Sequence, residues 1–263
     1  MRYTEISPVP ALQDFIHNYW CFEVSGNEPV SFPVQHRTLP ECQRSVVLIS
    51  HPYYRGIRIA GPRTEAFQLP VFPPAVFIGI RFQPWVIWPF EALSGLSLLN
   101  DTADAPTEIA SVWDADWIGQ IKPGFDDWAR LQEQTEALLS AFPLQSHALV
   151  RYICHSLTQK RLIKEIVADI PASTRVIQRT FKQTTGLTMK QYASNLRQRK
   201  LWEDMVQSSS GSMLETILDH GYFDQSHFIH EFQRRMQVSH QDFRKYLNSI
   251  QVSLDLSEDL VHS

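Results

Sequence analysis

Apolar and polar positions in the C-terminal third of the chain follow the same pattern twice, with an offset of 51 positions. In each copy two apolar residues lie four positions apart, which would place them on one face of a helix. These pairs are Ile177 with Phe181 and Phe228 with Phe232. A shorter apolar pattern precedes each copy, as Leu162-Ile163-x-x-Ile166 and Met213-Leu214-x-x-Ile217. The pattern predicts two tandem helix-turn-helix units, which are typical of proteins that bind DNA.

The first 99 residues show a different pattern, in which short β-branched or aromatic runs alternate with proline and glycine. Of the 16 prolines in the chain, 12 lie between Met1 and Leu99. Three runs have the composition of strands: Val46–Ser50, Gly56–Ala60 and Ala75–Phe82. Several short strands separated in this way indicate a small barrel or jelly roll. We therefore predict a β-rich effector or dimerisation domain over residues 1–105.

The pattern becomes helical over residues 106–144, which we predict to be a linker or dimerisation segment. A helix from about Phe125 to Ala141 carries an apolar stripe, and Pro143 would end it because proline cannot continue a helix. The stripe consists of Trp128, Leu131, Leu138, Leu139 and Phe142. It is equally consistent with packing on the β-rich domain and with a dimer seam.

Charge divides along the chain in the same way. Residues 1–144 hold 9 Lys and Arg against 16 Asp and Glu, a net −7, while residues 145–249 hold 15 against 9, a net +6. Residues 250–263 are polar with a net −3, and we expect a disordered tail. A positive segment beside an acidic one indicates a DNA-binding domain at 145–249, although a fluctuation in surface charge would give the same numbers.

The remaining features of the sequence argue against an enzyme, a metal-binding protein and a membrane protein. Three cysteines form no C-x-x-C pair, and their odd number argues against a disulfide framework. The spacing of the candidate metal ligands fits no known pattern: His17, Cys21, His36, Cys42 and His51. The chain start lacks a signal-peptide pattern, and the most apolar stretch, Leu69 to Ile80, contains three prolines. We expect no catalytic residue, metal or cofactor, and a soluble, cytoplasmic protein without membrane contact.

The second helix of the first copy is predicted to begin at Ser173, whose hydroxyl would cap it. With Ile177 and Phe181 facing the core, the polar side chains fall on the outer face. The candidate DNA-binding residues are Ser173, Thr174, Arg175, Gln178, Arg179 and Lys182. Arginine donates to guanine with two N–H groups and glutamine pairs with adenine, which suits a major-groove edge. The alternative is an ordinary solvated face.

The corresponding face of the second copy carries less charge. Its candidate DNA-binding residues are Gln225, Ser226, His227, Ile229 and His230, with Gln233 on the same face. Ile229 would pack on a thymine methyl and Gln225 would hydrogen-bond a base. This helix is expected to bind less tightly and specify less than the first, or only to contact the DNA backbone.

Two motifs span these helices: Ser173-x-Arg-x-Ile-x-Arg-x-Phe-Lys-x-x-x-Gly186-Leu-Thr-x-x-x-Tyr192 and Gly221-Tyr-x-Asp-Gln-Ser-His-Phe228-x-x-x-Phe232. The region from Ile166 to Leu247 resembles the DNA-binding domain of the AraC/XylS family of bacterial transcription regulators. The resemblance implies an all-α domain of seven helices, in which a long helix from about Thr188 to Val206 separates two recognition helices. Those helices would enter adjacent major grooves on one face of the duplex.

Five residues depart from the family pattern. His230 stands at a usual Arg, Gln233 at a usual Lys and Gln237 at a usual Gly, while Met189 and His240 stand at usual Pro positions. The first two changes weaken phosphate or base contact. Gln237 calls into question the turn after the last recognition helix, because glycine is the residue that adopts positive φ at low cost.

The family resemblance also implies an N-terminal domain that senses an effector or dimerises, often cupin-like in fold. Three short segments resemble an uncharacterised N-terminal domain type of some members: Tyr19-Trp20-Cys-Phe22, Leu39-Pro-Glu-Cys42 and Gly79-Ile-Arg-Phe82. The Trp and Phe residues of this region would line an apolar pocket or simply form the core.

The sequence therefore predicts an α+β protein with a cupin-like N-terminal domain and a double helix-turn-helix C-terminal domain, acting as a transcription regulator and not as an enzyme. Double-stranded DNA is the expected partner, with an unknown small-molecule effector, a second copy of the chain and, for an activator, RNA polymerase. One alternative is a cupin-type enzyme or metal-binding protein fused to a vestigial DNA-binding module. Another is an architectural DNA-binding protein without an effector.

Overall fold

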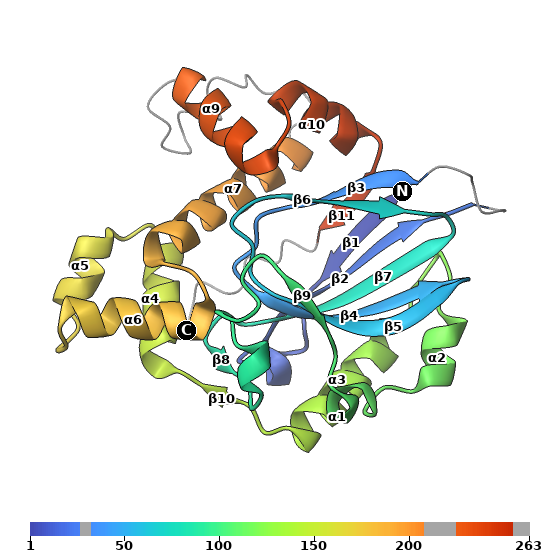
Figure 1. Cartoon of the computed structure of the whole chain (residues 1–263), viewed down its shortest axis with the longest axis horizontal. Helices are drawn as coiled ribbons and strands as arrows, with labels where there is room; N and C mark the ends of the chain where they lie inside the picture. The colour runs from blue at the N-terminus through green and yellow to red at the C-terminus, as the bar shows by residue number, and fades with distance from the viewer. Residues whose placement is uncertain (27–32, 208–224, 255–263) are drawn as a thin grey trace.

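The chain folds as an α+β protein, with a β-rich N-terminal part and a helical C-terminal part (Figure 1). A computed structural model describes residues 1–26, 33–207 and 225–254. The strands are β1 (Arg2–Ile6), β2 (Ile16–Val24), β3 (Val34–Thr38), β4 (Arg44–His51), β5 (Tyr54–Ala60), β6 (Phe67–Val71), β7 (Ala75–Phe82), β8 (Val86–Ile87), β9 (Thr102–Asp104), β10 (Gln145–Ser146) and β11 (Gln251–Leu254). The α-helices are α1 (Thr107–Ala110), α2 (Ala115–Gln120), α3 (Trp128–Ala141), α4 (Ala148–Thr158), α5 (Ile163–Ala168), α6 (Thr174–Thr185), α7 (Met189–Gln207), α9 (Gln225–Met236) and α10 (His240–Asn248).

Seven of the strands form one sheet in the order β11–β1–β2–β7–β4–β5–β9, while β3 and β6 pair in a separate ribbon. Neighbours in the large sheet are antiparallel, except for β1 and β11, which run parallel. The ribbon packs on one face of the sheet through a small apolar cluster that includes Phe22 of β2 and Val71 of β6. The β-rich N-terminal domain expected from the sequence is confirmed, and β4, β5 and β7 contain the three predicted strands.

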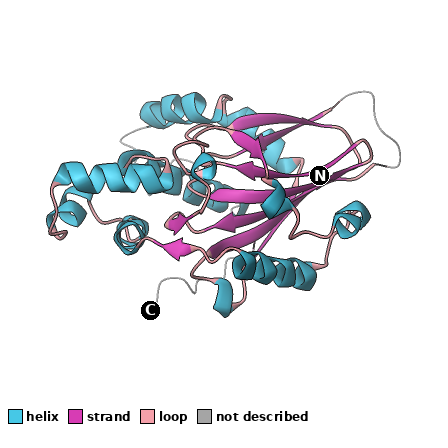
Figure 2. Ribbon diagram, turned by 60° about the horizontal axis from the view of Figure 1, so that its bottom comes forward, coloured by secondary structure: helices cyan, strands magenta, loops and turns pink. Residues whose placement is uncertain are grey.

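Helices α1, α2 and α3 cover the opposite face of the sheet (Figures 1 and 2). The predicted helix from Phe125 to Ala141 is α3, which begins at Trp128. Leu131 and Leu138 on its stripe are fully buried in the main apolar core together with strand residues such as Ile78. The stripe therefore packs on the β-rich domain, and the alternative of a dimer seam built from Leu131 and Leu138 is wrong.

The helices of the C-terminal part follow the predicted order. The Ser173 hydroxyl accepts a hydrogen bond from the Val176 amide and so caps α6, as expected. The long helix predicted from Thr188 to Val206 is α7, shifted by one residue at each end. Six helices of the expected seven-helix domain, α4 to α7 with α9 and α10, lie within the described residues, whereas Met213, Leu214 and Ile217 lie outside them.

The two recognition helices end in the same left-handed turn, although only one ends in glycine. Gly186 after α6 has φ 79°, and its amide donates to the Lys182 carbonyl (2.8 Å). Gln237 after α9 has φ 58°, and its amide donates to the Gln233 carbonyl (2.8 Å). The turn that Gln237 called into question is therefore formed, at the cost of a side chain in a conformation that favours glycine.

The predicted tail needs a correction, because its first part is a strand. Gln251–Leu254 form β11, which pairs with β1 from Arg2↔Gln251 to Glu5↔Leu254. The short alternation of polar and apolar residues in β11 allows Val252 and Leu254 to pack inward. Residues 255–263 lie outside the described residues. The C-terminal end of the domain is thus joined to the N-terminal sheet.

One apolar core crosses the boundary predicted at residues 144 and 145. It contains strand residues of the sheet together with Ile153 of α4, Ile177 of α6 and Tyr192 of α7. The strand β10, directly after the boundary, pairs with β8. The β-rich and helical parts therefore pack as one body. No helix in the described part of the chain has the length and apolar character required to span a bilayer.

Candidate nucleic-acid interface

The first head, formed by α5 and α6, presents the predicted polar face to solvent. Ile177 and Phe181 are fully buried, and the Phe181 ring meets Tyr192 of α7 edge-on at 5.6 Å between centroids. All six candidate residues of this head are exposed: Ser173, Thr174, Arg175, Gln178, Arg179 and Lys182. Three cations and one amide thus lie on one accessible helix face, which is the chemistry that phosphates and base edges attract.

The second head consists of α9 with α10 packed behind it. Ser226, His227 and His230 are exposed as predicted, and Gln233 lies on the same face. His227 Nε2 lies 3.9 Å from the carboxylate of Glu231, one turn further along α9. Gln225 begins α9, but its side chain lies outside the described residues.

Ile229 departs from the expectation of an outward side chain. It is half-buried and packs against a second, smaller apolar core, formed by residues of α7, α9 and α10. The members of this core are Leu201, Trp202, Phe228, Phe232, Met236, Phe243 and Leu247. Only the solvent-facing part of Ile229 is left for a thymine methyl.

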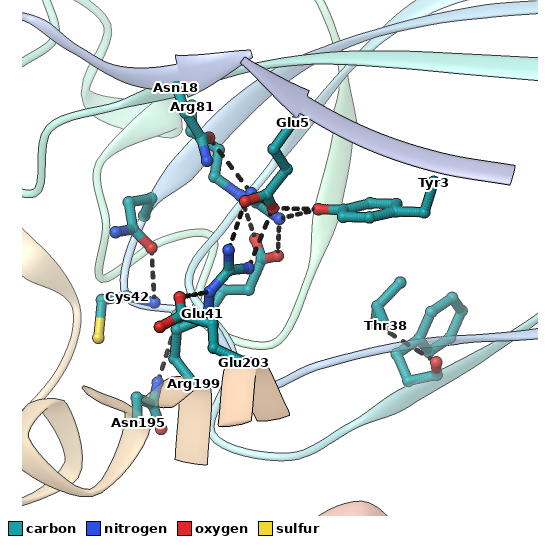
Figure 3. Close-up of polar contacts among 12 residues, drawn as sticks. Tyr3, Glu5, Asn18, Thr38, Glu41, Cys42, Arg81, Asn195, Arg199 and Glu203 are labelled. Carbon is teal, nitrogen blue, oxygen red and sulfur yellow. Dashed lines mark hydrogen bonds and ion pairs between the residues drawn. The ribbon is translucent and has the colours of Figure 1, made fainter. Parts of the chain in front are cut away.

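The long helix α7 connects the heads and lies against the N-terminal sheet through a buried charge cluster (Figure 3). Glu5 of β1 is 4% exposed and accepts hydrogen bonds from Arg81 of β7 (2.6 Å) and from Arg199 of α7 (3.0 Å). Arg199 also donates to Glu203 (2.7 Å), one turn further along the helix. The Tyr3 hydroxyl donates to Glu5 as well. Both arginines therefore share one buried carboxylate across the junction.

Opposite charges keep Glu5 ionised despite its burial. Burial alone would raise the pKa of this carboxyl, but the attraction of Arg199 and of Arg81 outweighs it and holds the pKa well below its usual range. Burial would likewise lower the pKa of Arg199, and Glu5 reverses this so that the pKa is raised. Each member of the cluster is stabilised only while its partners remain in place.

Glu41 completes the cluster from the turn after the ribbon strand β3. Its carboxylate forms an ion pair with Arg81, and Arg81 also donates to Asn18 (3.2 Å). The Tyr3 ring meets the Trp202 ring edge-on at 6.0 Å, so the polar cluster continues into the smaller core of the second head. The N-terminal domain thus touches the part of α7 that leads to the second head.

The first head meets the N-terminal domain through a close backbone approach instead. A Cβ on Gly95 would lie 2.6 Å from the Thr185 carbonyl carbon and 2.8 Å from the Gly186 amide, so only glycine fits this close approach. Beside this approach, the Cys42 thiol donates to the carbonyl of Tyr192 near the start of α7 (3.6 Å). Burial raises the pKa of Cys154, which lies in the same core.

The sequence reasoning missed Glu5, Arg81 and Arg199. A usable signal was present for Arg81, because it is the one charged residue in the otherwise apolar strand β7, and a weaker one for Glu5, which lies between Thr4 and Ile6 in β1. The candidate metal ligands are not assembled: His17 and Cys21 lie on β2, His36 on β3 and His51 at the end of β4. Within the described residues, no group of three or more His, Cys, Asp or Glu side chains could hold a metal ion.

Two family models match the chain. A helix-turn-helix domain matches residues 166–246, and a domain of unknown function, DUF6597, matches residues 4–104. No curated protein sequence matches the chain.

Among solved structures, an apo ToxT variant from Vibrio cholerae strain SCE256 is 8% identical, with a TM-score of 0.50 over 87% of this chain and 97% of that one. A second ToxT structure from Vibrio cholerae is 10% identical, with a TM-score of 0.47 over 94% of this chain and 99% of that one. At such identity the likeness concerns the fold alone.

The fold, the repeated helices and the exposed polar face of α6 define a helix-turn-helix DNA-binding transcription regulator. Residues 166–246 form a helix-turn-helix domain of the AraC type, as the resemblance to the AraC/XylS family implied.

Proposed function

We propose that the protein binds a specific DNA sequence by placing α6 and α9 in adjacent major grooves, and that its N-terminal domain controls this binding as a regulator and not as an enzyme. The observation that carries the proposal is the exposed face of α6, where Arg175, Gln178 and Arg179 stand beside Lys182. Residues 145–249 would then form the DNA-binding unit and residues 1–105 the effector or dimerisation unit, with 106–144 connecting them.

In the first head we assign base contacts to Gln178 and Arg179, because their amide and guanidinium groups match adenine and guanine edges. Ser173 and Thr174, at the start of α6, lie where backbone N–H groups point outward and attract a phosphate. Lys182 adds a positive charge at the other end of the helix, suited to the DNA backbone.

In the second head we assign contacts to Gln225, Ser226, His227 and His230, with the remaining exposed part of Ile229 against a base methyl. This face carries no permanent charge among these residues, so it would contribute less affinity and a weaker salt dependence than α6. The two heads would therefore contribute differently to binding: α6 would supply most of the affinity, and α9 would extend the recognised sequence.

The effector, the second subunit and RNA polymerase remain proposals on the basis of the family. An unsaturated fatty acid is bound in one ToxT structure, which is 8% identical to this chain with a TM-score of 0.43 over 88% of this chain and 95% of that one. Since Leu131 and Leu138 are buried, a dimer would have to use another surface.

Selection of random DNA with the full-length protein, followed by gel-shift titration, tests the proposal. We expect one enriched sequence with two recognised segments about one helical turn apart, and binding that weakens as salt rises because counterions are released from phosphates. Enrichment of no sequence, or a flat salt dependence, would contradict a sequence-specific regulator.

A further inference from the structure

One amide side chain, that of Asn195 on α7, touches three parts of the molecule at once. Figure 3 shows one of these contacts, with Glu41. Asn195 is 1% exposed. Its Nδ2 donates to the carbonyls of Glu41 (2.9 Å) and Arg63 (2.8 Å), two N-terminal residues that also bridge each other as a short antiparallel pair. Both amide hydrogens are therefore used on the N-terminal domain.

The oxygen of the same amide points to the second head. Asn195 Oδ1 accepts a hydrogen bond from Nη2 of Arg235, which lies on α9 and is 4% exposed. Nη1 of Arg235 donates to Ser194, whose hydroxyl in turn donates to Glu231 of α9 (3.0 Å). A buried guanidinium is costly without acceptors, so these bonds fix where α9 lies on α7.

Arg235 lies on the inner face of α9. It follows Phe228 and Phe232 at helical spacing, while Ser226 and His230 lie on the exposed face. Because Arg235 is part of α9, any shift or rotation of the helix that moves Arg235 also moves the residues proposed to contact DNA.

A second bond ties the end of α9 directly to the N-terminal domain. The Ala66 amide donates to the Arg235 carbonyl (2.8 Å), and Gln237 donates from Nε2 to Glu65 (3.1 Å). The segment from Arg63 to Ala66 thus contacts Asn195 at one end and the α9 terminus at the other. The position of α9 is set by the N-terminal domain at two neighbouring points.

The first head has a different support. Ile177 and Phe181 of α6 are buried in the main core, with Ile153 and Leu157 of α4. In the described part of the chain, Asn195 makes no hydrogen bond to α6. Loss of the Asn195 amide should therefore disturb α9 and leave α6 in place.

We propose that Asn195 is a positioning residue that transmits the state of the N-terminal domain to the second recognition helix, and so sets how strongly the second DNA segment is read. The inference rests on the proposed function and assigns the regulation of that site to one side chain. A rearrangement of the Glu41–Arg63 pair changes the partners of Asn195, and through Arg235 it changes α9. The N-terminal domain then controls the length of sequence recognised, while α6 stays bound.

The test uses full-length protein and the DNA sequence selected with it, with each of the two recognised segments scrambled in turn. Sensitivity lost in Arg179→Ala identifies the segment read by α6. In the unmodified protein, scrambling either segment should weaken binding. In Asn195→Ala, scrambling the α9 segment should weaken binding almost no further, whereas scrambling the α6 segment should weaken binding as much as it does in the unmodified protein. We expect the variant to bind the intact sequence about tenfold more weakly, within the range of coupling between sites.

Asn195→Asp distinguishes the contacts of Asn195 with the N-terminal domain from its contact with Arg235. It keeps an acceptor for Arg235 but loses both donors to the Glu41 and Arg63 carbonyls, so it should lose α9 sensitivity if the N-terminal end matters. Asn248→Ala, which removes an exposed amide from α10 of the same head, is the matched control and should behave like the unmodified protein. Circular dichroism and a melting curve for each variant establish that it is folded.

Full sensitivity to both segments in Asn195→Ala and Asn195→Asp would overturn the proposal. An equal loss of sensitivity to scrambling at both segments would also overturn it, because it would indicate a general structural role for Asn195. If Asn195→Ala does not fold, Asn195→Asp and Arg235→Lys decide by the same comparison. Failure of the unmodified protein to select any sequence would instead refute the proposed function.

Discussion

The two heads repeat one sequence pattern but are supported in different ways. The apolar face of α6 is part of the main core, shared with α4 and the N-terminal sheet. The apolar face of α9 belongs to a smaller core, and Tyr3, Leu39 and Ala66 of the N-terminal domain pack against it. A repeated pattern therefore specifies the local fold of each head, whereas its attachment depends on residues far away in the sequence.

The difference extends to the polar contacts. The first head meets the N-terminal domain by the close backbone approach at Gly95, while the second is joined by side chains, by the backbone bond from Ala66 to Arg235 and by β11. Tyr246 of α10 shows this, because its hydroxyl accepts from the Arg37 amide (3.0 Å) and lies 2.7 Å from Nδ1 of His36. Burial lowers the pKa of His36 to about 3, so its ring is neutral in this contact. The second head should respond more strongly to changes in the N-terminal domain.

The largest effect is expected from Arg81→Met. This change leaves Glu5 and Glu41 without their shared cation, and removing one partner of a buried ion pair costs about 3–5 kcal/mol. Arg58→Met is the matched control, since its partner Asp104 is largely exposed and such pairs contribute under about 1 kcal/mol. Urea unfolding measures both changes. Hydrogen exchange should show faster opening in α9 and α10 than in α6, and uniform opening would contradict the distinction between the heads.

The second effect concerns DNA affinity. Arg179→Ala should weaken binding by about 1–3 kcal/mol, because a good bidentate contact to a base contributes that much. His230→Ala should cost less, since this side chain is exposed and lacks a fixed charge. Gel-shift titration on the selected sequence compares them, with Lys245→Ala on the exposed side of α10 as a control for lost charge. A larger loss for His230→Ala would reverse the ranking of the heads.

Local periodicity explains what the sequence could predict. The face of α6, the face of α9 except for Ile229, the Ser173 cap and the extent of α7 depend on neighbours within a few positions, and these were confirmed within the described residues. The β11 strand was missed although Gln-Val-Ser-Leu alternates polar and apolar residues, because its partner β1 lies at the other end of the chain. A four-residue alternation predicts a strand only when its partner is known.

The junction residues are harder to predict for the same reason. Asn195 and Gln198 are polar positions on a helix with a weakly amphipathic sequence, and nothing local shows that both are buried. The burial of Asn195 follows from the N-terminal segments at Glu41 and Arg63, which contact α7. Arg235 resembled one of several cations at the end of α9, and only the fold shows that it faces inward.

Removal of β11 tests the attachment of the second head with a smaller effect. A chain ending at Ile250 loses the packing of Val252 and Leu254 on the smaller core, and partial burial of two aliphatic side chains corresponds to about 1–2 kcal/mol. Hydrogen exchange should accelerate in α9, α10 and β1, while α4 and α6 keep their protection. A full-length Val252→Thr variant, which keeps the strand, should give part of the effect. Equal acceleration in both heads would contradict a separate support.

The smallest change in stability is expected from substitutions in the turns that follow the two recognition helices. Gln237→Gly should stabilise the protein by about 0.5–1 kcal/mol, because φ 58° is strained for a side chain and glycine adopts it freely. The exposed bond to Glu65 is lost, which offsets a little of this gain. Gln237→Asn is the control, since asparagine tolerates this conformation and its stability should fall between those of the Gln and Gly proteins.

In the first head, Gly186→Ala should destabilise the protein instead, because the new Cβ would lie 2.1 Å from the Gly95 carbonyl oxygen. Thermal and urea unfolding of the three variants measure these differences. A loss of stability in Gln237→Gly would show that the side chain at this turn contributes more than its backbone strain costs.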